Sequence, residues 1–251
     1  MPANSYVSKV QPWKHGRGRG MPLVIFCYDS TMHHSTNEGL QWLANPEQVQ
    51  AAHNHLLALG ELTVRFADVE RAPRYPDGDR ETDVEHSYHL ALSAMELAAD
   101  YYPNLDVGLV AQFSLAHDLP EVYTGDVRTF NISSEDRAKK EQAEKEALAR
   151  LLQELPPYTA QLLERYERQI EPEARFVRFV DKLLPAIITI VASDANTFKE
   201  DYGMTSAAAV LKDREARTTQ LQAMFPEFQF IHMVRDMLSK TSLEHLFPGE
   251  T

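Results

Sequence analysis

The sequence predicts an all-α fold with a short irregular or β-containing N-terminal extension. From Pro46 onward, apolar residues recur at helical spacing and are interrupted only by short turns that contain Pro, Gly or Asp. The one strand-like run, residues 23–28, is too short and solitary to imply a substantial sheet. We therefore expect a helical domain over residues 46–251 and an extension over residues 1–45.

Each helix of this domain is predicted from the helical spacing of its apolar residues. The expected helices cover residues 46–59, 61–71, 84–101, 106–118, 134–154, 157–170, 173–200, 205–223 and 227–245. The helix 106–118 is apolar almost all round, which is typical of a central, buried helix. A kink is expected beside Asp181, because Pro185 lacks the N–H that would bond to the carbonyl of that residue. Residues 73–83 are expected to form a polar loop and one wall of a site.

Composition and charge narrow the class of protein. The chain has 251 residues, of which 43% are hydrophobic and 25% are charged, and this is the size of one large domain. Cys27 is the only cysteine, which excludes intrachain disulfides and thiolate zinc clusters. No apolar run approaches the roughly 18 residues needed to span a bilayer, and no signal core is present. We expect a cytoplasmic protein without membrane contact.

The net charge of -12 opposes stable binding to nucleic acid, whose backbone is also negative. The segment 1–28 is the exception, because it holds Lys9, Lys14, Arg17 and Arg19 and no acid. Its prolines and glycines favour an irregular arm over a nucleic-acid surface. No stable nucleic-acid binding is expected.

Four polar residues form a candidate ligand set for one divalent metal: His86, the pair His117 and Asp118, and Asp181. They lie in three segments that are all expected to be helical. Two imidazole nitrogens and two carboxylate oxygens suit a borderline metal such as Mn, Co, Fe, Ni or Zn, with positions left for water and substrate. Burying these carboxylates without a cation would be costly. The set indicates metal-assisted hydrolysis.

Two further acids follow the His-Asp pair. If helical geometry persists past Pro120, Glu121 lies one turn beyond His117 on the same face, where it could orient or deprotonate a metal-bound water. Asp126 is expected on a turn at the rim, where it could protonate a leaving oxygen or accept a hydrogen bond from a substrate hydroxyl. The remaining histidines lack such carboxylate patterns, and surface or core roles are expected for them.

In this order, these residues resemble the HD-domain metal-dependent phosphohydrolases. They are similar in particular to the HD 5'-deoxynucleotidases and to the HD-type deoxynucleoside triphosphate hydrolases of phages. The likeness covers about residues 60–200 and rests on Glu85-His86-Ser87, on the run from His117 to Asp126, and on the distal Asp181. It implies an HD-domain helical bundle and a nucleotide-pool enzyme of a bacterium or a phage-infected cell. It also implies a homodimer or a higher homo-oligomer.

The resemblance also implies roles for single residues. It implies that His86, His117, Asp118 and Asp181 bind one metal ion, that Glu121 assists catalysis and that Asp126 lies at the substrate. An arginine upstream of the first histidine binds phosphate in this family, and Arg71 stands at the matching place. The chain departs from the family at Ala72, where many relatives carry an aromatic residue that packs on the sugar; Tyr75 is a candidate substitute.

The sequence leaves several alternatives open. Residues 119–180 contain no histidine, and this favours a mononuclear over a two-metal site. The ion could be Co, Mn, Zn, Fe, Ni or Mg.

The expected reaction releases a nucleoside plus phosphate or plus triphosphate. A nucleotide-binding regulator without turnover and a helical interaction protein with a structural metal are the other function classes. Lys182 could contact the substrate or be solvated.

Overall fold

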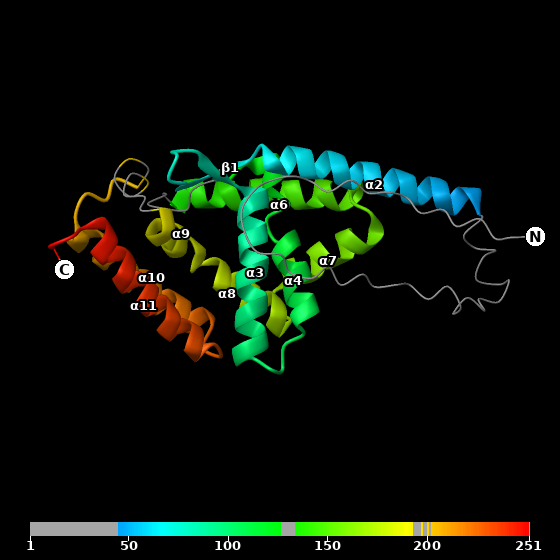
Figure 1. Ribbon diagram of the computed structural model, residues 1–251. Coiled ribbons are helices and arrows are strands. Elements are labelled where there is room, and N and C mark those ends of the chain that lie inside the picture. Colours follow the sequence, from blue (N-terminus) through cyan, green and yellow to red (C-terminus); the bar gives the residue numbers. More distant parts are fainter. Residues whose placement is uncertain (1–44, 127–133, 193–196, 198–199, 201, 251) are drawn as a thin grey trace, which may run out of the picture. The chain divides into compact units, whose positions relative to one another are not determined.

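The computed structural model describes residues 45–126, 134–192, 197, 200 and 202–250, and this part of the chain is helical apart from one two-stranded sheet. The predicted all-α class is therefore confirmed. Figure 1 shows the elements in chain order. The helices are α2 (Pro46–Ala67), α3 (Asp83–Tyr101), α4 (Val107–Ala116), α5 (Glu121–Thr124), α6 (Ser134–Glu154), α7 (Pro157–Arg168), α8 (Pro172–Asp181), α9 (Leu184–Ala192), α10 (Ala207–Met224) and α11 (Gln229–Leu246). Strands β1 (Glu70–Arg74) and β2 (Arg80–Thr82) pair antiparallel.

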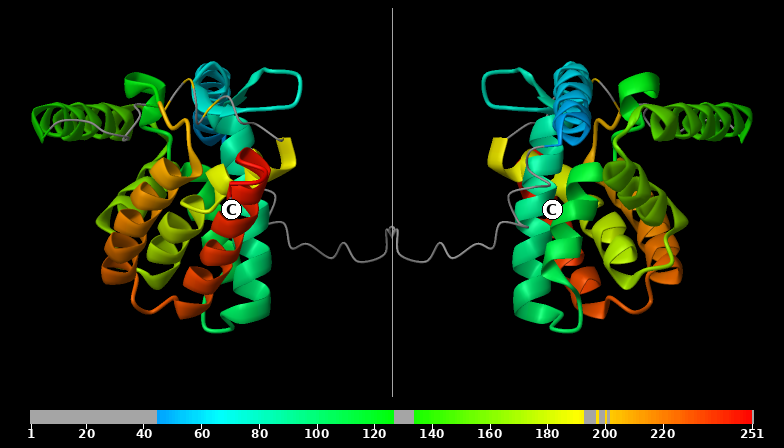
Figure 2. Two further views of the ribbon diagram at one scale, coloured as in Figure 1. Left: turned by 90° about the vertical axis from the view of Figure 1, so that its left-hand side faces the viewer. Right: turned by 90° about the vertical axis from the view of Figure 1, so that its right-hand side faces the viewer.

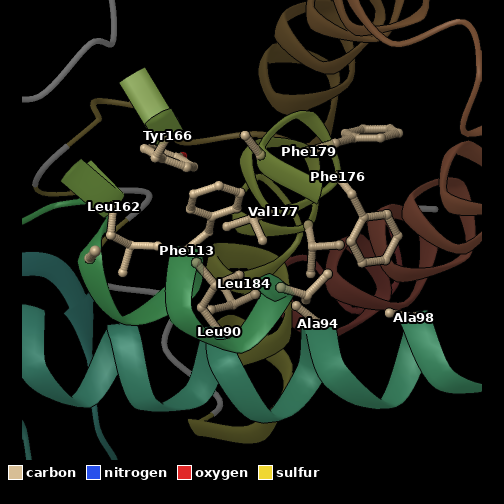
Figure 3. Close-up of a cluster of buried hydrophobic side chains, with 14 of the residues drawn as sticks. Leu90, Ala94, Ala98, Phe113, Leu162, Tyr166, Phe176, Val177, Phe179 and Leu184 are labelled. Atoms are coloured by element: carbon tan, nitrogen blue, oxygen red, sulfur yellow. The ribbon is translucent and has the colours of Figure 1, made fainter. Parts of the chain in front are cut away.

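Helix α3 packs against both α4 and α8. Its buried stripe consists of Leu90, Ala94 and Ala98, which are four residues apart and fully buried (Figure 3). The two alanines let the neighbouring helices approach closely. His86 lies one turn before Leu90 on the same stripe and is also buried. The spacing that forms the core therefore also points His86 into the protein.

In helices α4 and α8 the buried stripe also leads to a candidate ligand, here at the C-terminal end. In α4 the buried positions Val110 and Phe113 lead to His117, and in α8 Val177 leads to Asp181 four residues on. Full burial of a side chain such as Phe113 contributes roughly 1.5–3 kcal/mol to folding. Apolar packing thus fixes the three helices whose ends present the candidate ligands.

The C-terminal helices α10 and α11 lie side by side, joined by a short turn, and α11 packs against α9 (Figure 2). Phe225 closes this turn onto the core, because its ring stacks on Phe179 of α8 with centroids 5.0 Å apart. No helix in the described part of the chain is long and apolar enough to cross a membrane.

The first two predicted helices are in fact one. Residues 46–59 and 61–71 were expected to be separated at Gly60, but α2 runs through Gly60 without a break and ends at Ala67. A glycine inside a helix costs about 1 kcal/mol relative to alanine, which is too little to end a helix that is supported on both sides. The prediction was also wrong at residues 70 and 71, which belong to β1.

The expected polar loop 73–83 is instead most of a β-hairpin. Strand β1 pairs with β2, and two backbone hydrogen bonds close the turn: Tyr75 N–H donates to the carbonyl of Asp79, and Gly78 N–H donates to the carbonyl of Tyr75. Gly78 has a φ of +95°, a conformation that side-chain-bearing residues rarely adopt. The strands were missed because they are short and mostly polar, and their sequences show no alternation of apolar and polar residues. The hairpin brings Arg71 beside the N-terminus of α3.

The predicted helix 173–200 is divided. Helix α8 ends at Asp181, and α9 begins at Leu184 with Pro185 in its first turn. The expected kink beside Asp181 is therefore a full interruption, consistent with the missing N–H of Pro185. The other predicted helices agree with the structure within two residues at each end.

Two predictions fall outside the described residues. These are the strand-like run 23–28 and the irregular, basic arm within residues 1–28. The division of the chain into an extension over 1–45 and a domain over 46–251 stays a prediction.

Candidate metal and phosphate site

The four candidate metal ligands come together at the ends of three helices. Nε2 of His86 lies 3.0 Å from Oδ1 of Asp181 and 3.8 Å from Oδ2 of Asp118. Nε2 of His117 lies 2.8 Å from the same Oδ2 of Asp118. The two imidazole rings have centroids 5.3 Å apart. Residues up to 95 positions apart in sequence therefore present their donor atoms to one small volume.

The contacts of His117 are those expected of a metal ligand. Its Nδ1 lies 2.9 Å from the carbonyl oxygen of Ser114, to which only an N–H can donate. In the neutral imidazole, Nε2 then carries a lone pair and points at a carboxylate oxygen of Asp118 without forming a hydrogen bond. Two lone pairs at this distance repel each other unless a cation lies between them. Two imidazoles and two carboxylates suit a borderline divalent metal.

His86 is held in an acidic environment. Burial lowers the pKa of its ring, but hydrogen bonding to Asp181 and to Glu81 outweighs burial and raises this pKa to about 9. Oε2 of Glu81 lies 3.6 Å from Nδ1 of His86, on the side of the ring away from Asp181. A carboxylate behind a ligating histidine fixes the orientation of the ring and increases its basicity.

Arg71 lies at the centre of a group of carboxylates. Its Nη1 donates to Oδ1 of Asp83 at 2.8 Å and to Oδ2 of Asp118 at 2.9 Å. Nη1 is also 3.6 Å from Oε2 of Glu121, and Nε is 3.8 Å from Oε2 of Glu81. Burial lowers the pKa of Arg71, but the negative charges of Asp118, Asp126, Asp181 and Glu121 raise it well above its ordinary value. The guanidinium is therefore a permanent positive charge in direct contact with a candidate metal ligand.

Glu121 reaches the site by a different local geometry from the one expected. An unbroken helix past Pro120, the condition for placing Glu121 on the face of His117, is not found: α4 ends at Ala116, and Glu121 begins the short helix α5. Its carboxylate nevertheless lies beside Arg71. Burial and the neighbouring charges of Asp118 and Asp83 raise the pKa of Glu121, because another negative charge is unfavourable there.

Asp126 follows a turn, as expected. Gly125 ends α5 with a φ of +66°, which is favourable for glycine, and the partly buried Asp126 comes directly after it. The negative charge of Asp126 raises the pKa values of Arg71 and of Glu121, which places it within electrostatic reach of both.

A cavity of about 510 Å³ opens on the metal candidates, and its described walls include His117, Asp118 and Asp181. Glu121 and Lys182 line it as well. Nζ of Lys182 donates to Oδ2 of Asp181 at 2.6 Å while half of its side chain stays exposed. The two alternatives for this lysine were substrate contact and solvation. Its position at the wall is compatible with both.

Two buried acids at this site were not singled out in the sequence. Glu81 and Asp83 have side chains that are 1% and 0% exposed. They had been assigned to the expected polar loop, where acids are ordinarily solvated. The sequence signal was their position five and three residues before His86, a candidate metal ligand.

Ala72, where many relatives carry the sugar-packing aromatic residue, and Tyr75, its candidate substitute, do not line the cavity. Ala72 is buried, and its carbonyl oxygen accepts hydrogen bonds from Arg80 and Thr197. Tyr75 is at the hairpin turn, and burial and the acids Glu81 and Glu85 raise the pKa of its hydroxyl to about 12. Neither residue is among the described walls of the cavity.

Comparisons with known proteins find similar sequences that share one name. The chain is 36% identical over 100 residues to the 5'-deoxynucleotidase HDDC2 of Xenopus laevis, an alignment that covers 39% of this chain and 48% of that protein. It is 31% identical over 121 residues to the human protein of the same name, covering 45% and 58%. The chain thus spans about half the length of the curated relatives it matches.

A solved structure has a similar fold along most of its length. It is described as a predicted metal-dependent phosphohydrolase from Magnetospirillum magnetotacticum MS-1. The two chains superpose with a TM-score of 0.59 at 25% sequence identity, covering 76% of this chain and 94% of the other. The model of the HD domain family matches residues 65–222, which contain every candidate site residue named above. The chain belongs to the HD domain family.

Proposed function

We propose that the protein is a metal-dependent phosphohydrolase that acts on nucleotides, as a 5'-deoxynucleotidase that releases nucleoside and phosphate. The observation that carries the proposal is the contact between Arg71 and Asp118 at 2.9 Å. It joins a candidate phosphate-binding cation to a candidate metal ligand. The relatives named 5'-deoxynucleotidase support the substrate class.

We assign one divalent metal ion to His86, His117, Asp118 and Asp181. An ion bound there would lower the pKa of a coordinated water and polarise a phosphoryl oxygen. Arg71 binds the anionic phosphate and neutralises charge as the reaction proceeds. Glu121 orients the attacking water, and Asp126 hydrogen-bonds to the substrate at the rim. Lys182 adds a positive contact from the cavity wall.

A triphosphate substrate is the second candidate. Four basic residues line the same cavity, namely Lys140, Lys145, Arg178 and Lys182, and such a group suits a longer phosphate chain. Four glutamates line it as well, which weakens this attraction. The volume of about 510 Å³ is within the range of small-molecule sites. We therefore place the monophosphate first.

A regulator that binds nucleotides without turnover uses the same pocket. Glu121 and Asp126 are both present beside Arg71, which supports the enzyme over the regulator. We further propose that the protein works in the cytoplasm on the nucleotide pool and forms a homodimer or a higher homo-oligomer.

The proposal is tested with metal-stripped protein that is reloaded with Mn, Co, Zn, Fe, Ni or Mg. Each form is incubated with ribo- and deoxynucleoside mono- and triphosphates, and the products are separated by chromatography. We expect metal-dependent release of nucleoside and phosphate, absent in Asp118→Ala. Release of intact triphosphate would select the second candidate. Nucleotide binding without turnover under any metal would overturn the enzyme assignment in favour of the regulator.

A further inference from the structure

Asp83 is a completely buried carboxylate that has no place among the described walls of the cavity. It is the first residue of α3, and its backbone N–H donates to the carbonyl oxygen of Val69 at 3.0 Å. A capping box between Thr82 and Glu85 fixes the same helical turn. The side chain therefore projects from a backbone that is held on both sides.

The side chain of Asp83 is directed at Arg71. Its Oδ1 accepts a hydrogen bond from Nη1 at 2.8 Å, and the same nitrogen donates to Oδ2 of Asp118 at 2.9 Å. Both hydrogens of Nη1 therefore donate to carboxylates, one at the start of α3 and one just after the end of α4. Among the described residues, none forms a hydrogen bond or an ion pair with Nη2 of Arg71. Hydrogen bonds therefore hold the guanidinium through Nη1, and Nη2 is left to bind a ligand.

Folding stability does not account for this arrangement. Moving a carboxylate out of water costs several kcal/mol, and replacing a buried ion pair by apolar residues of similar volume is often neutral or stabilising. Functional sites in contrast require side chains whose rotamers are fixed by a second layer of hydrogen bonds.

Without Asp83, Arg71 would keep only one short contact, the one to Asp118. That contact lies on the metal side of the guanidinium, and a single hydrogen bond leaves the planar group free to rotate about it. Two acceptors on one nitrogen define the orientation of the plane. A displacement of about 1 Å at a substrate-orienting group can cost roughly 100-fold in rate.

We propose that Asp83 is a positioning residue for Arg71 and fixes the guanidinium so that Nη2 faces the phosphate of a nucleotide bound at Asp118. The inference rests on the proposed function and extends it to a residue that is not among the described walls of the cavity. Asp83 acts on the phosphate through Arg71. Its removal therefore affects phosphate recognition and leaves the metal in place.

The test compares Asp83→Ala and the isosteric Asp83→Asn with the wild type in steady-state hydrolysis. We expect KM for the nucleotide to rise by about tenfold in Asp83→Ala and by less in Asp83→Asn, because the amide retains one acceptor oxygen. Metal content is expected to be unchanged. A purely structural defect would lower the active fraction, and hence the apparent kcat, at constant KM. Glu85→Gln is the matched control: it removes a carboxylate from the same turn while the amide oxygen can still close the capping box.

A double-mutant cycle with Arg71→Lys makes the test specific. If Asp83 acts through the guanidinium, Asp83→Ala has less than a twofold further effect on kcat/KM in the Arg71→Lys background. An equal loss in both backgrounds, or an unchanged KM in the single variants, would overturn the inference.

Failure of the proposed function is distinguishable from failure of this inference. If the wild type hydrolyses no nucleotide, the function is wrong, and the role of Asp83 is then judged by calorimetry with inorganic phosphate and metal-loaded protein. A phosphate affinity about tenfold weaker in Asp83→Ala supports the inference, and equal affinities overturn it.

Discussion

Nε2 of His86 lies 3.0 Å from Oδ1 of Asp181, although 95 residues separate the two in sequence. His86 is in the first turn of α3, and Asp181 is the last residue of α8. The two helices pack against each other through the apolar core, so that core packing determines whether the two side chains meet. This contact joins two of the four proposed metal ligands.

Removing one proposed ligand should remove the metal. Asp181→Asn keeps the shape of the side chain but loses the negative charge, and we expect loss of the bound ion after dialysis, with loss of activity. The measurement is metal content by atomic emission. Asp236→Asn, an exposed position on α11, is the control and should retain metal. Full metal occupancy in Asp181→Asn would remove this residue from the ligand set.

The metal-free protein should lose stability as the pH is raised. The pKa of His86 is about 9 in the folded protein, against an ordinary value of 6.5. Protonated His86 therefore contributes stability that is complete below pH 6.5 and is lost as the pH rises through 9.

This prediction is checked by chemical unfolding in the presence of a chelator. We expect the difference in unfolding free energy between the wild type and His86→Asn to shrink between pH 6.5 and 9. His245→Ala, an exposed position on α11, controls for the loss of an unrelated histidine. A difference that does not change with pH over this window would contradict the proposed ion pair with Asp181.

Glu121→Gln should abolish turnover without releasing the metal. The amide cannot exchange a proton with the attacking water as a carboxyl group can, and we expect kcat to fall by about 100-fold to 10,000-fold. Metal content and nucleotide binding are measured in parallel and should be retained. Glu146→Gln, on the exposed face of α6, is the matched control. Near-normal kcat in Glu121→Gln would mean that another group orients the water.

Glu81→Gln should weaken metal binding. Glu81 lies 3.6 Å from Nδ1 of His86, and an acid behind a ligating histidine typically contributes about 10-fold to 100-fold in metal affinity. Competition with a chromophoric chelator measures this affinity. The variant is compared with Glu85→Gln, which removes an exposed acid four residues away. Equal affinities would show that Glu81 serves Arg71 alone.

Local sequence patterns were sufficient for the helical class and for the candidate ligands. Apolar spacing predicts α3 and α4 within one or two residues, because amphipathic periodicity is a property of neighbouring residues. The same spacing places His86 and His117 on the buried stripes of their helices. Patterns also failed where they were weak: Gly60 suggested a break that the helix does not make, and the polar hairpin was read as a loop.

The sequence by itself determined which residues can bind a metal, since the chemistry of His117, Asp118 and the others is intrinsic to their side chains. Only the tertiary structure decided that Asp83 and Glu81 are buried against Arg71, because a short polar strand has no period that reveals its partner. It likewise decided that Glu121 approaches the guanidinium from a new helix. Contacts between distant segments depend on how the helices pack, and packing is a property of the whole core.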